Sequence, residues 1–149
     1  MQTQNPTTVL IFGTFDIFHK GHINFIKQAR ACGDSNSTSK STALIAVIAR
    51  DKTVLEIKGK LPKNNENKRK KILLKSGLVD KVVLGSLKDK YSAIRKYKPA
   101  IICLGYDQTN FVAKLPLLYK KGQGVVIRLK PYKPHIYKSS LMKSPATKT

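Results

Sequence analysis

The chain has 149 residues, 41% of them hydrophobic, and its 29 lysines and arginines against 8 acidic residues give a formal net charge of +21. This length suits one folded domain, and the hydrophobic fraction excludes disorder of the whole chain. No apolar run approaches the roughly 20 residues that cross a bilayer, and residues 1–8 lack the segments of a secretory signal, so we expect a cytoplasmic protein that does not enter a membrane.

Short apolar runs alternate along the chain with segments of helical periodicity. Gly33 and Asp34 are expected to end the first helix, and Gly77 the second. A Ser/Thr-rich stretch over 35–42 is predicted to be an inserted polar loop, and 59–67 a basic loop. In chain order, the patterns predict a strand over 9–12, a helix over 23–31, a strand over 43–49, a helix over 68–76, a strand over 81–85, a helix over 89–97, a strand over 100–104, a helix over 111–121, a strand over 124–129 and a short helix over 139–143.

This alternation favours a parallel sheet with helices on both faces. We therefore predict an α/β fold: a single Rossmann-like, doubly wound parallel sheet of about five strands. It would form one domain over residues 1–149, with flexible tails over 1–7 and 144–149. Cys103 is expected to be a buried strand residue, and two cysteines do not indicate a disulfide framework. Ligands of such sheets bind beyond the carboxyl ends of the strands.

The strongest feature is the turn after the first strand, Gly13-Thr14-Phe15-Asp16-Ile17-Phe18-His19-Lys20-Gly21-His22. Histidines three residues apart at a helix start lie on one side of it, where backbone N–H groups attract anions. Gly13 would let the chain leave the sheet sharply, and Gly21 would leave room for a phosphate. Two imidazoles placed there can stabilise the charge that builds on a triphosphate during phosphoryl transfer.

Other uses of two histidines fit less well. His135 is the one other histidine, and no carboxylate or cysteine cluster completes a zinc site, so we assign no metal ligand. The turn matches neither a P-loop nor a dinucleotide-binding fingerprint. An anionic acceptor can attack in line without a covalent intermediate, which leaves positioning and electrostatics to the protein.

The pattern Gly-Thr-Phe-Asp-x-Phe-His-x-Gly-His resembles the signature of the cytidylyltransferase-like nucleotidyltransferases, and the resemblance covers nearly the whole chain. The motifs Ala-Arg-Asp-x-Thr-Val, Lys-Gly-Lys-x-Pro and Leu-Gly-Tyr-Asp-Gln look most like those of the archaeal-type FAD synthases, which transfer AMP from ATP to FMN. They lie at residues 49–54, 58–62 and 104–108. The polar loop over 35–42 is longer than the family usually carries.

The resemblance implies roles for particular residues. His19 and His22 would stabilise the transition state. The nucleotide would be bound by Gly13, Thr14, Phe15, Lys20, Gly21, Gly105, Asp107, Ser139 and Ser140. The phosphates or the acceptor would be bound by Asp16, Lys58, Lys60, Arg69 and Lys143. Each role has an ordinary structural alternative: Lys58 and Lys60 as solvated charges, Asp107 as a helix cap, Arg69 as the partner of Glu66, and Ser139 and Ser140 as a terminal loop.

The implied activity is that of an FMN adenylyltransferase, which makes FAD and pyrophosphate from ATP and FMN with Mg²⁺ or another divalent cation. A cytidylyltransferase acting on glycerol 3-phosphate or a related phospho-alcohol stays open, as does a sugar-phosphate adenylyltransferase. The resemblance also leaves a homodimer open. Outside this class, the +21 charge keeps a nucleic-acid-binding protein as an alternative, although the sequence carries no zinc-finger spacing, RNA-binding aromatic motif or recognition-helix signature.

Overall fold

The computed structural model describes residues 6–35, 41–89, 91–105 and 124–130, which form a five-stranded, all-parallel sheet with helices. The strand order is β3-β2-β1-β4-β5, which confirms the predicted α/β fold. The predictions for residues 111–121, 139–143 and 144–149 lie outside the described residues. In chain order the elements are β1 (Thr7–Gly13), α1 (Lys20–Ser35), β2 (Thr42–Ile48), α2 (Asp51–Lys58), α3 (Glu66–Ser76), β3 (Lys81–Leu84), α4 (Ser92–Tyr97), β4 (Ile101–Leu104) and β5 (Val125–Arg128).

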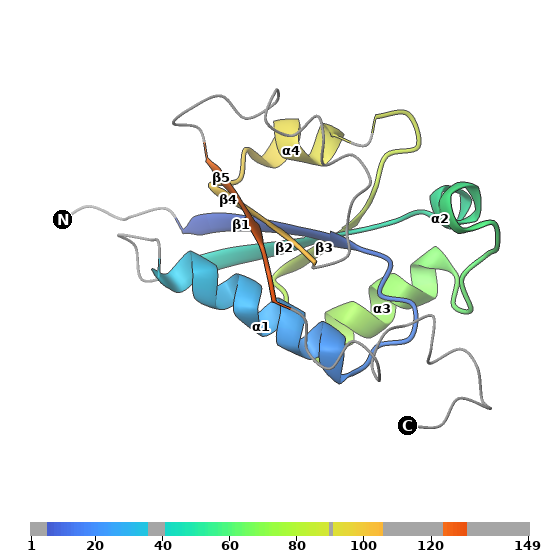
Figure 1. The fold of residues 1–149 in the computed structure, drawn as a ribbon, viewed down its shortest axis with the longest axis horizontal. Helices are drawn as coiled ribbons and strands as arrows, with labels where there is room; N and C mark the ends of the chain where they lie inside the picture. The colour runs from blue at the N-terminus through green and yellow to red at the C-terminus, as the bar shows by residue number, and fades with distance from the viewer. Residues whose placement is uncertain (1–5, 36–40, 90, 106–123, 131–149) are drawn as a thin grey trace.

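Helices cover both faces of the sheet, as a doubly wound fold requires. Figure 1 shows α1 and α3 on one face and α4 on the other. Successive side chains of β1 point to opposite faces: Val9 and Ile11 belong to the core cluster on the α1 face, and Leu10 and Phe12 to the cluster on the α4 face. A strand buried on both sides has a continuous apolar sequence, which is why β1 could be predicted from the sequence. Within the part of the chain described here, no helix has the length and apolar character needed to span a membrane.

The strand order reverses at β1, because β2 and β3 lie on one side of it and β4 and β5 on the other. β1 pairs with β2 from Thr7 opposite Thr42 to Gly13 opposite Ile48. Ligands of open parallel sheets bind at such a reversal, beyond the carboxyl ends of the strands. We call that side, where β1 ends at Gly13, the carboxyl edge, and the opposite side the amino edge. Both predicted histidines follow β1 and therefore lie at the carboxyl edge.

Several boundaries differ from the sequence prediction. Thr7 was predicted to belong to a tail over 1–7, but it begins β1, and its N–H donates to the Ser41 carbonyl at 3.1 Å. Ser35 and Thr42 were predicted to belong to an inserted loop over 35–42, but Ser35 belongs to α1 and Thr42 to β2. Residues 1–5 and 36–40 lie outside the described residues. α4 begins at Ser92, whereas the helix was predicted from residue 89. Cys103 is buried in β4, as predicted.

The prediction that Gly33 and Asp34 end the first helix is wrong, because α1 continues to Ser35. Gly33 permits close packing instead. A Cβ added to it would lie 2.5 Å from Cγ2 of Thr42 and 2.8 Å from Cγ2 of Val9. This glycine therefore allows α1 to pack closely against β1 and β2, and it does not mark a helix end.

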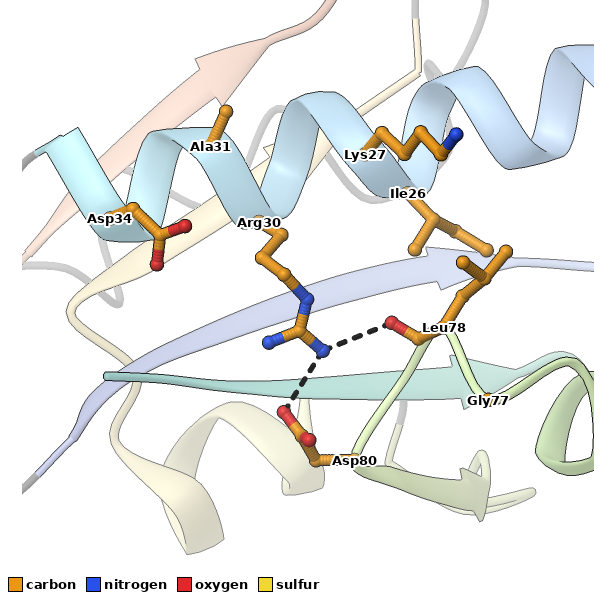
Figure 2. Close-up of a pocket in the computed structure, with 8 residues that line it drawn as sticks. All are labelled: Ile26, Lys27, Arg30, Ala31, Asp34, Gly77, Leu78 and Asp80. Atoms are coloured by element: carbon orange, nitrogen blue, oxygen red, sulfur yellow. Dashed lines mark hydrogen bonds and ion pairs between the residues drawn. The ribbon is translucent and has the colours of Figure 1, made fainter. Parts of the chain in front are cut away.

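Arg30 of α1 links the elements that meet at the amino edge. Its guanidinium donates to the carbonyl oxygens of Thr42 at 3.3 Å and Leu78 at 3.0 Å, and to the Asp80 carboxylate at 3.2 Å. Asp80 also accepts from the Leu44 N–H at 2.8 Å. Figure 2 shows Arg30 with its contacts to Leu78 and Asp80. These three residues line an open pocket of about 510 Å³ between α1 and the segment after α3. The Arg30 and Asp80 side chains are 35% and 51% exposed, so water reaches this ion pair.

Candidate active site

The turn that follows β1 is tight and carries a strained residue. Phe15 has a φ of 50°, in the left-handed region that bulky residues rarely adopt. It is only 4% exposed, and its ring lies so close to Gly13 that a Cβ there would be 2.8 Å from a ring carbon. Phe15, and not Gly13 as predicted, thus has the unusual backbone conformation, while Gly13 leaves room for the ring. Strain of this kind is concentrated at functional sites.

His19 and His22 lie together at the start of α1, with ring centroids 3.9 Å apart and ring planes 23° from parallel. The Gly21 N–H donates to Nδ1 of His19 at 3.0 Å, and the His19 N–H donates to Nδ1 of His22 at 3.3 Å. Phe15 and Phe18 pack against the His22 ring, with centroids 5.3 and 5.6 Å away. Since Nδ1 accepts a hydrogen bond in both rings, the proton of each neutral imidazole is on Nε2.

Burial keeps both imidazoles uncharged at neutral pH. It is the main cause that lowers the pKa of His22 to about 3, and the charges of His19 and Lys58 lower it further, while Asp16 opposes them. Burial also lowers the pKa of His19. Each ring therefore offers one Nε2–H donor at pH 7. Two fixed donors at a helix start suit an anion on which charge builds during a reaction.

Arg69 of α3 holds this turn in place from inside the protein. Its guanidinium is fully buried and forms an ion pair with Asp51 at 2.8 Å. It also donates to three carbonyl oxygens from three different segments: Thr14 at 2.9 Å, Ala49 at 2.8 Å and Asn64 at 2.9 Å. Arg69 thereby joins the turn after β1, the end of β2 and the loop before α3.

This placement corrects both predictions made for Arg69. A side chain with no exposed surface is not available to the acceptor or to the phosphates. Its ion-pair partner is Asp51, whereas Glu66 pairs with Arg50 at 3.0 Å. Arg69 is therefore a residue that positions the site from within.

Asp16 is also a structural residue of the site. It is 1% exposed, and its two carboxylate oxygens accept hydrogen bonds from the backbone N–H groups of Lys63 at 2.8 Å and Asn64 at 2.9 Å. The Asn64 side-chain amide donates to the Asp16 carbonyl oxygen at 2.8 Å. These contacts fix the loop before α3 against the histidine turn. The predicted contact of Asp16 with the acceptor or a metal-bound phosphate stays a prediction.

Sequence reasoning missed α2, and the reason lies in its capping. Arg50 at its N-cap makes no side-chain cap. The cap comes instead from α3: Glu66 accepts from the Asp51 N–H at 2.8 Å, and Asp51 accepts from the Glu66 N–H at 3.2 Å. This reciprocal cap connects residues 15 apart, so no local motif reveals it. The acidic Asp51 at the start and Gly59 after the last turn were signals that could have identified the helix.

The other predicted site residues are placed as follows. Lys20 begins α1 and is exposed, and Gly21 follows it. Lys58 ends α2, Lys60 lies in the next loop, and both are exposed. Gly105 follows β4, and its carbonyl accepts from Arg128 at 2.7 Å. Asp107, Ser139, Ser140 and Lys143 lie outside the described residues. For all the residues named in this paragraph, the assigned ligands stay predictions.

Three comparisons place the chain among known proteins. It is 36% identical to an FAD synthase of Thermococcus sibiricus over 147 residues, and this aligned region covers 97% of this chain and 91% of that relative. An FAD synthase of Methanosarcina barkeri is 43% identical over 102 residues, which cover 68% of this chain and 66% of that relative. Among solved structures, a lipopolysaccharide core biosynthesis protein from Thermoplasma volcanium has a TM-score of 0.72 and 33% identity, over 86% of this chain and 99% of that one.

The family model described as cytidylyltransferase-like matches residues 10–144. That range contains the histidine turn, the buried Arg69, β1 from Leu10 onward and the other four strands in full. The sheet order, the paired Nε2–H donors at the strand reversal and the matched model agree, and we conclude that this chain belongs to the cytidylyltransferase-like family of nucleotidyltransferases.

Proposed function

We propose that this protein is an FMN adenylyltransferase, which joins the AMP part of ATP to FMN and so makes FAD and pyrophosphate. The observation that carries the chemistry is the pair of neutral imidazoles at the start of α1, His19 and His22, whose Nδ1 atoms are each held by a backbone N–H group. The choice of substrates is supported by the relatives in Thermococcus and Methanosarcina, which carry the name FAD synthase.

In the proposed reaction, a phosphate oxygen of FMN attacks the α-phosphorus of ATP in line. The new oxygen–phosphorus bond forms as the bond from the α-phosphorus to the bridging oxygen breaks, and that oxygen leaves with pyrophosphate. His19 and His22 donate from Nε2 to oxygens around the α-phosphorus, where negative charge develops. Neither ring needs to gain or lose a proton, because the attacking phosphate is already an anion.

ATP would enter as its magnesium complex, because Mg²⁺ binds phosphate oxygens with few protein ligands. No group of three His, Cys, Asp or Glu residues able to hold a metal occurs in the described ranges, and both carboxylate oxygens of Asp16 accept from backbone N–H groups. The protein's own contribution is the positioned pair of donors. Its substrates are cytoplasmic metabolites, so we place the enzyme in the cytoplasm.

A pyrophosphate-release assay tests the proposal. The purified protein is given magnesium with ATP or CTP, each combined with FMN, glycerol 3-phosphate or a sugar 1-phosphate. Of these combinations, we expect only ATP with FMN to release pyrophosphate, and we expect chromatography to identify FAD as the other product. Release with CTP and glycerol 3-phosphate, without FAD formation, would contradict the proposed substrates and leave the phosphoryl-transfer chemistry intact.

A further inference from the structure

Two large apolar side chains are exposed at the end of α2 and in the loop that follows it. Ile57 near the end of α2 is 52% exposed, and Leu61 in the loop that follows is 59% exposed. In sequence they bracket Lys58 and Lys60, so apolar and cationic residues alternate around the turn at Gly59. One exposed leucine is ordinary on a protein surface. Two exposed apolar residues around two lysines fit a ligand that is apolar in one part and anionic in another.

The segment that carries these residues is fixed against the active site. Asp16 accepts hydrogen bonds from the backbone of Lys63 and Asn64, directly after Leu61 and Pro62. The charge of Lys58 is close enough to contribute to the lowered pKa of His22. The segment that carries Ile57, Lys58, Lys60 and Leu61 therefore reaches the site at Lys58 and, through Lys63 and Asn64, at Asp16; we call these four residues the border of the site.

The turn between the two lysines is open to a ligand. Gly59 ends α2 with a φ of 78°, and its N–H donates to the Leu55 carbonyl at 2.8 Å. Among the residues that the structure describes, no heavy atom outside its chain neighbours would lie within 4 Å of a Cβ added to Gly59. In this described part of the chain, the space beside Gly59 is therefore open.

We propose that Ile57 and Leu61 bind the isoalloxazine ring of FMN, next to Lys58 and Lys60, to which the family resemblance already assigns a phosphate; this inference rests on the proposed function. FMN consists of a flat aromatic three-ring system joined by a five-carbon chain to one phosphate. The attack on ATP brings that phosphate to His19 and His22. The carbon chain then extends to the border formed by the two apolar side chains, which cover a face of the ring.

This arrangement distinguishes FMN from the other acceptors considered. Glycerol 3-phosphate and sugar phosphates carry a phosphate for the lysines, but they have no apolar ring. They therefore cannot bury the apolar surface of Ile57 and Leu61. The apolar pair is therefore a specificity determinant for a flavin, and the lysines alone are not.

The test uses glutamine substitutions, which keep side-chain length and remove apolar surface. Ile57→Gln and Leu61→Gln should each raise the KM for FMN about 5- to 20-fold, as expected for half-burial of an aliphatic side chain. The KM for ATP and the turnover at saturating FMN should stay near wild type. Leu61→Met, which keeps the apolar surface, should retain a KM for FMN close to wild type.

Leu74→Gln is the matched control. Leu74 is a comparable 44% exposed leucine on α3, in the half that leads toward the amino edge. Its substitution should leave the KM for FMN unchanged, and thermal unfolding of all four variants shows whether each is folded. Binding of FMN alone, followed by quenching of flavin fluorescence, gives a second readout and should weaken in the two polar variants of the border.

The outcomes separate the two proposals. A wild-type protein that makes FAD, with both border variants unchanged in FMN binding and KM, would overturn the ring site and leave the proposed function standing. An equal rise in the KM for ATP and FMN would also overturn it, because it would indicate a general disturbance of the site. A folded wild-type protein that neither binds FMN nor makes FAD would overturn both.

Discussion

The two edges of the sheet are each held by an arginine, and the two arginines differ in their access to water. At the carboxyl edge Arg69 has no exposed surface, and it pairs with Asp51 at 2.8 Å. At the amino edge the side chains of Arg30 and Asp80 are 35% and 51% exposed. Water and salt weaken the second pair far more than the first. The histidine turn is therefore held by a buried network that tolerates little change. The amino edge is held by an exposed ion pair, which tolerates more.

Removal of Arg69 tests the buried side of this comparison and should have the largest effect on stability. Arg69→Leu leaves the Asp51 carboxylate and three carbonyl oxygens without their buried donor, so we expect a loss of about 3–5 kcal/mol in the free energy of unfolding. Urea denaturation of the wild type and the variant measures this loss in the free energy of unfolding. A loss below about 1 kcal/mol would show that the interior network does not hold the turn.

The pH dependence of stability tests the burial of His22. Its pKa is about 3 in the folded protein against 6.5 as the ordinary value. Below pH 6.5 the unfolded chain binds a proton that the folded protein does not, so stability present above pH 6.5 is lost as the pH falls toward 3. The slope is at most about 1.4 kcal/mol per pH unit.

His22→Asn isolates this contribution, because the other titrating groups are the same in both proteins. Between pH 7 and pH 4.5 the wild type should lose about 2–3 kcal/mol more stability than the variant. Denaturant curves at the two pH values give the difference. Equal losses would contradict a buried, neutral His22.

Gly33→Ala tests close packing at the amino edge. The added methyl group would meet Thr42 and Val9, and we expect a loss of about 1–3 kcal/mol. If Gly33 only ended the helix, alanine would instead stabilise α1, by up to about 1 kcal/mol. The sign of the change in thermal unfolding temperature therefore decides between packing and helix termination.

The smallest effect is expected for the exposed arginine. Arg30→Leu, the same substitution as at Arg69, should cost about 1 kcal/mol or less, because water hydrates the freed carboxylate of Asp80. Raising the salt concentration should reduce the difference between this variant and the wild type. A loss as large as that of Arg69→Leu would remove the contrast between the two edges.

The sheet and the histidine pair were predictable from the sequence because both depend on local patterns. Parallel strands buried on both faces produce apolar runs such as residues 9–12, and the spacing of His19 and His22 places them on one side of a helix start. The structure adds the tautomers of the two rings, which depend on backbone donors at Gly21 and His19.

The supporting residues were not predictable, because their partners are far away in sequence. Arg69 is buried by contacts from Thr14, Ala49 and Asn64, and no property of its own neighbourhood distinguishes it from an exposed arginine. α2 depends on a cap from Glu66, 15 residues after Asp51. Gly33 resembled a helix end because the strand residues that exclude a side chain there lie on β1 and β2.

The most direct test of the central claim is the turnover of FAD formation in His19→Asn and His22→Asn. Asparagine places an amide oxygen near the position of Nδ1 and keeps that backbone contact, but it has no donor where Nε2–H was. The account predicts a fall in kcat of about two to four orders of magnitude, with little change in ATP binding. Variants that fold and turn over at close to the wild-type rate would contradict the role of the two Nε2–H donors.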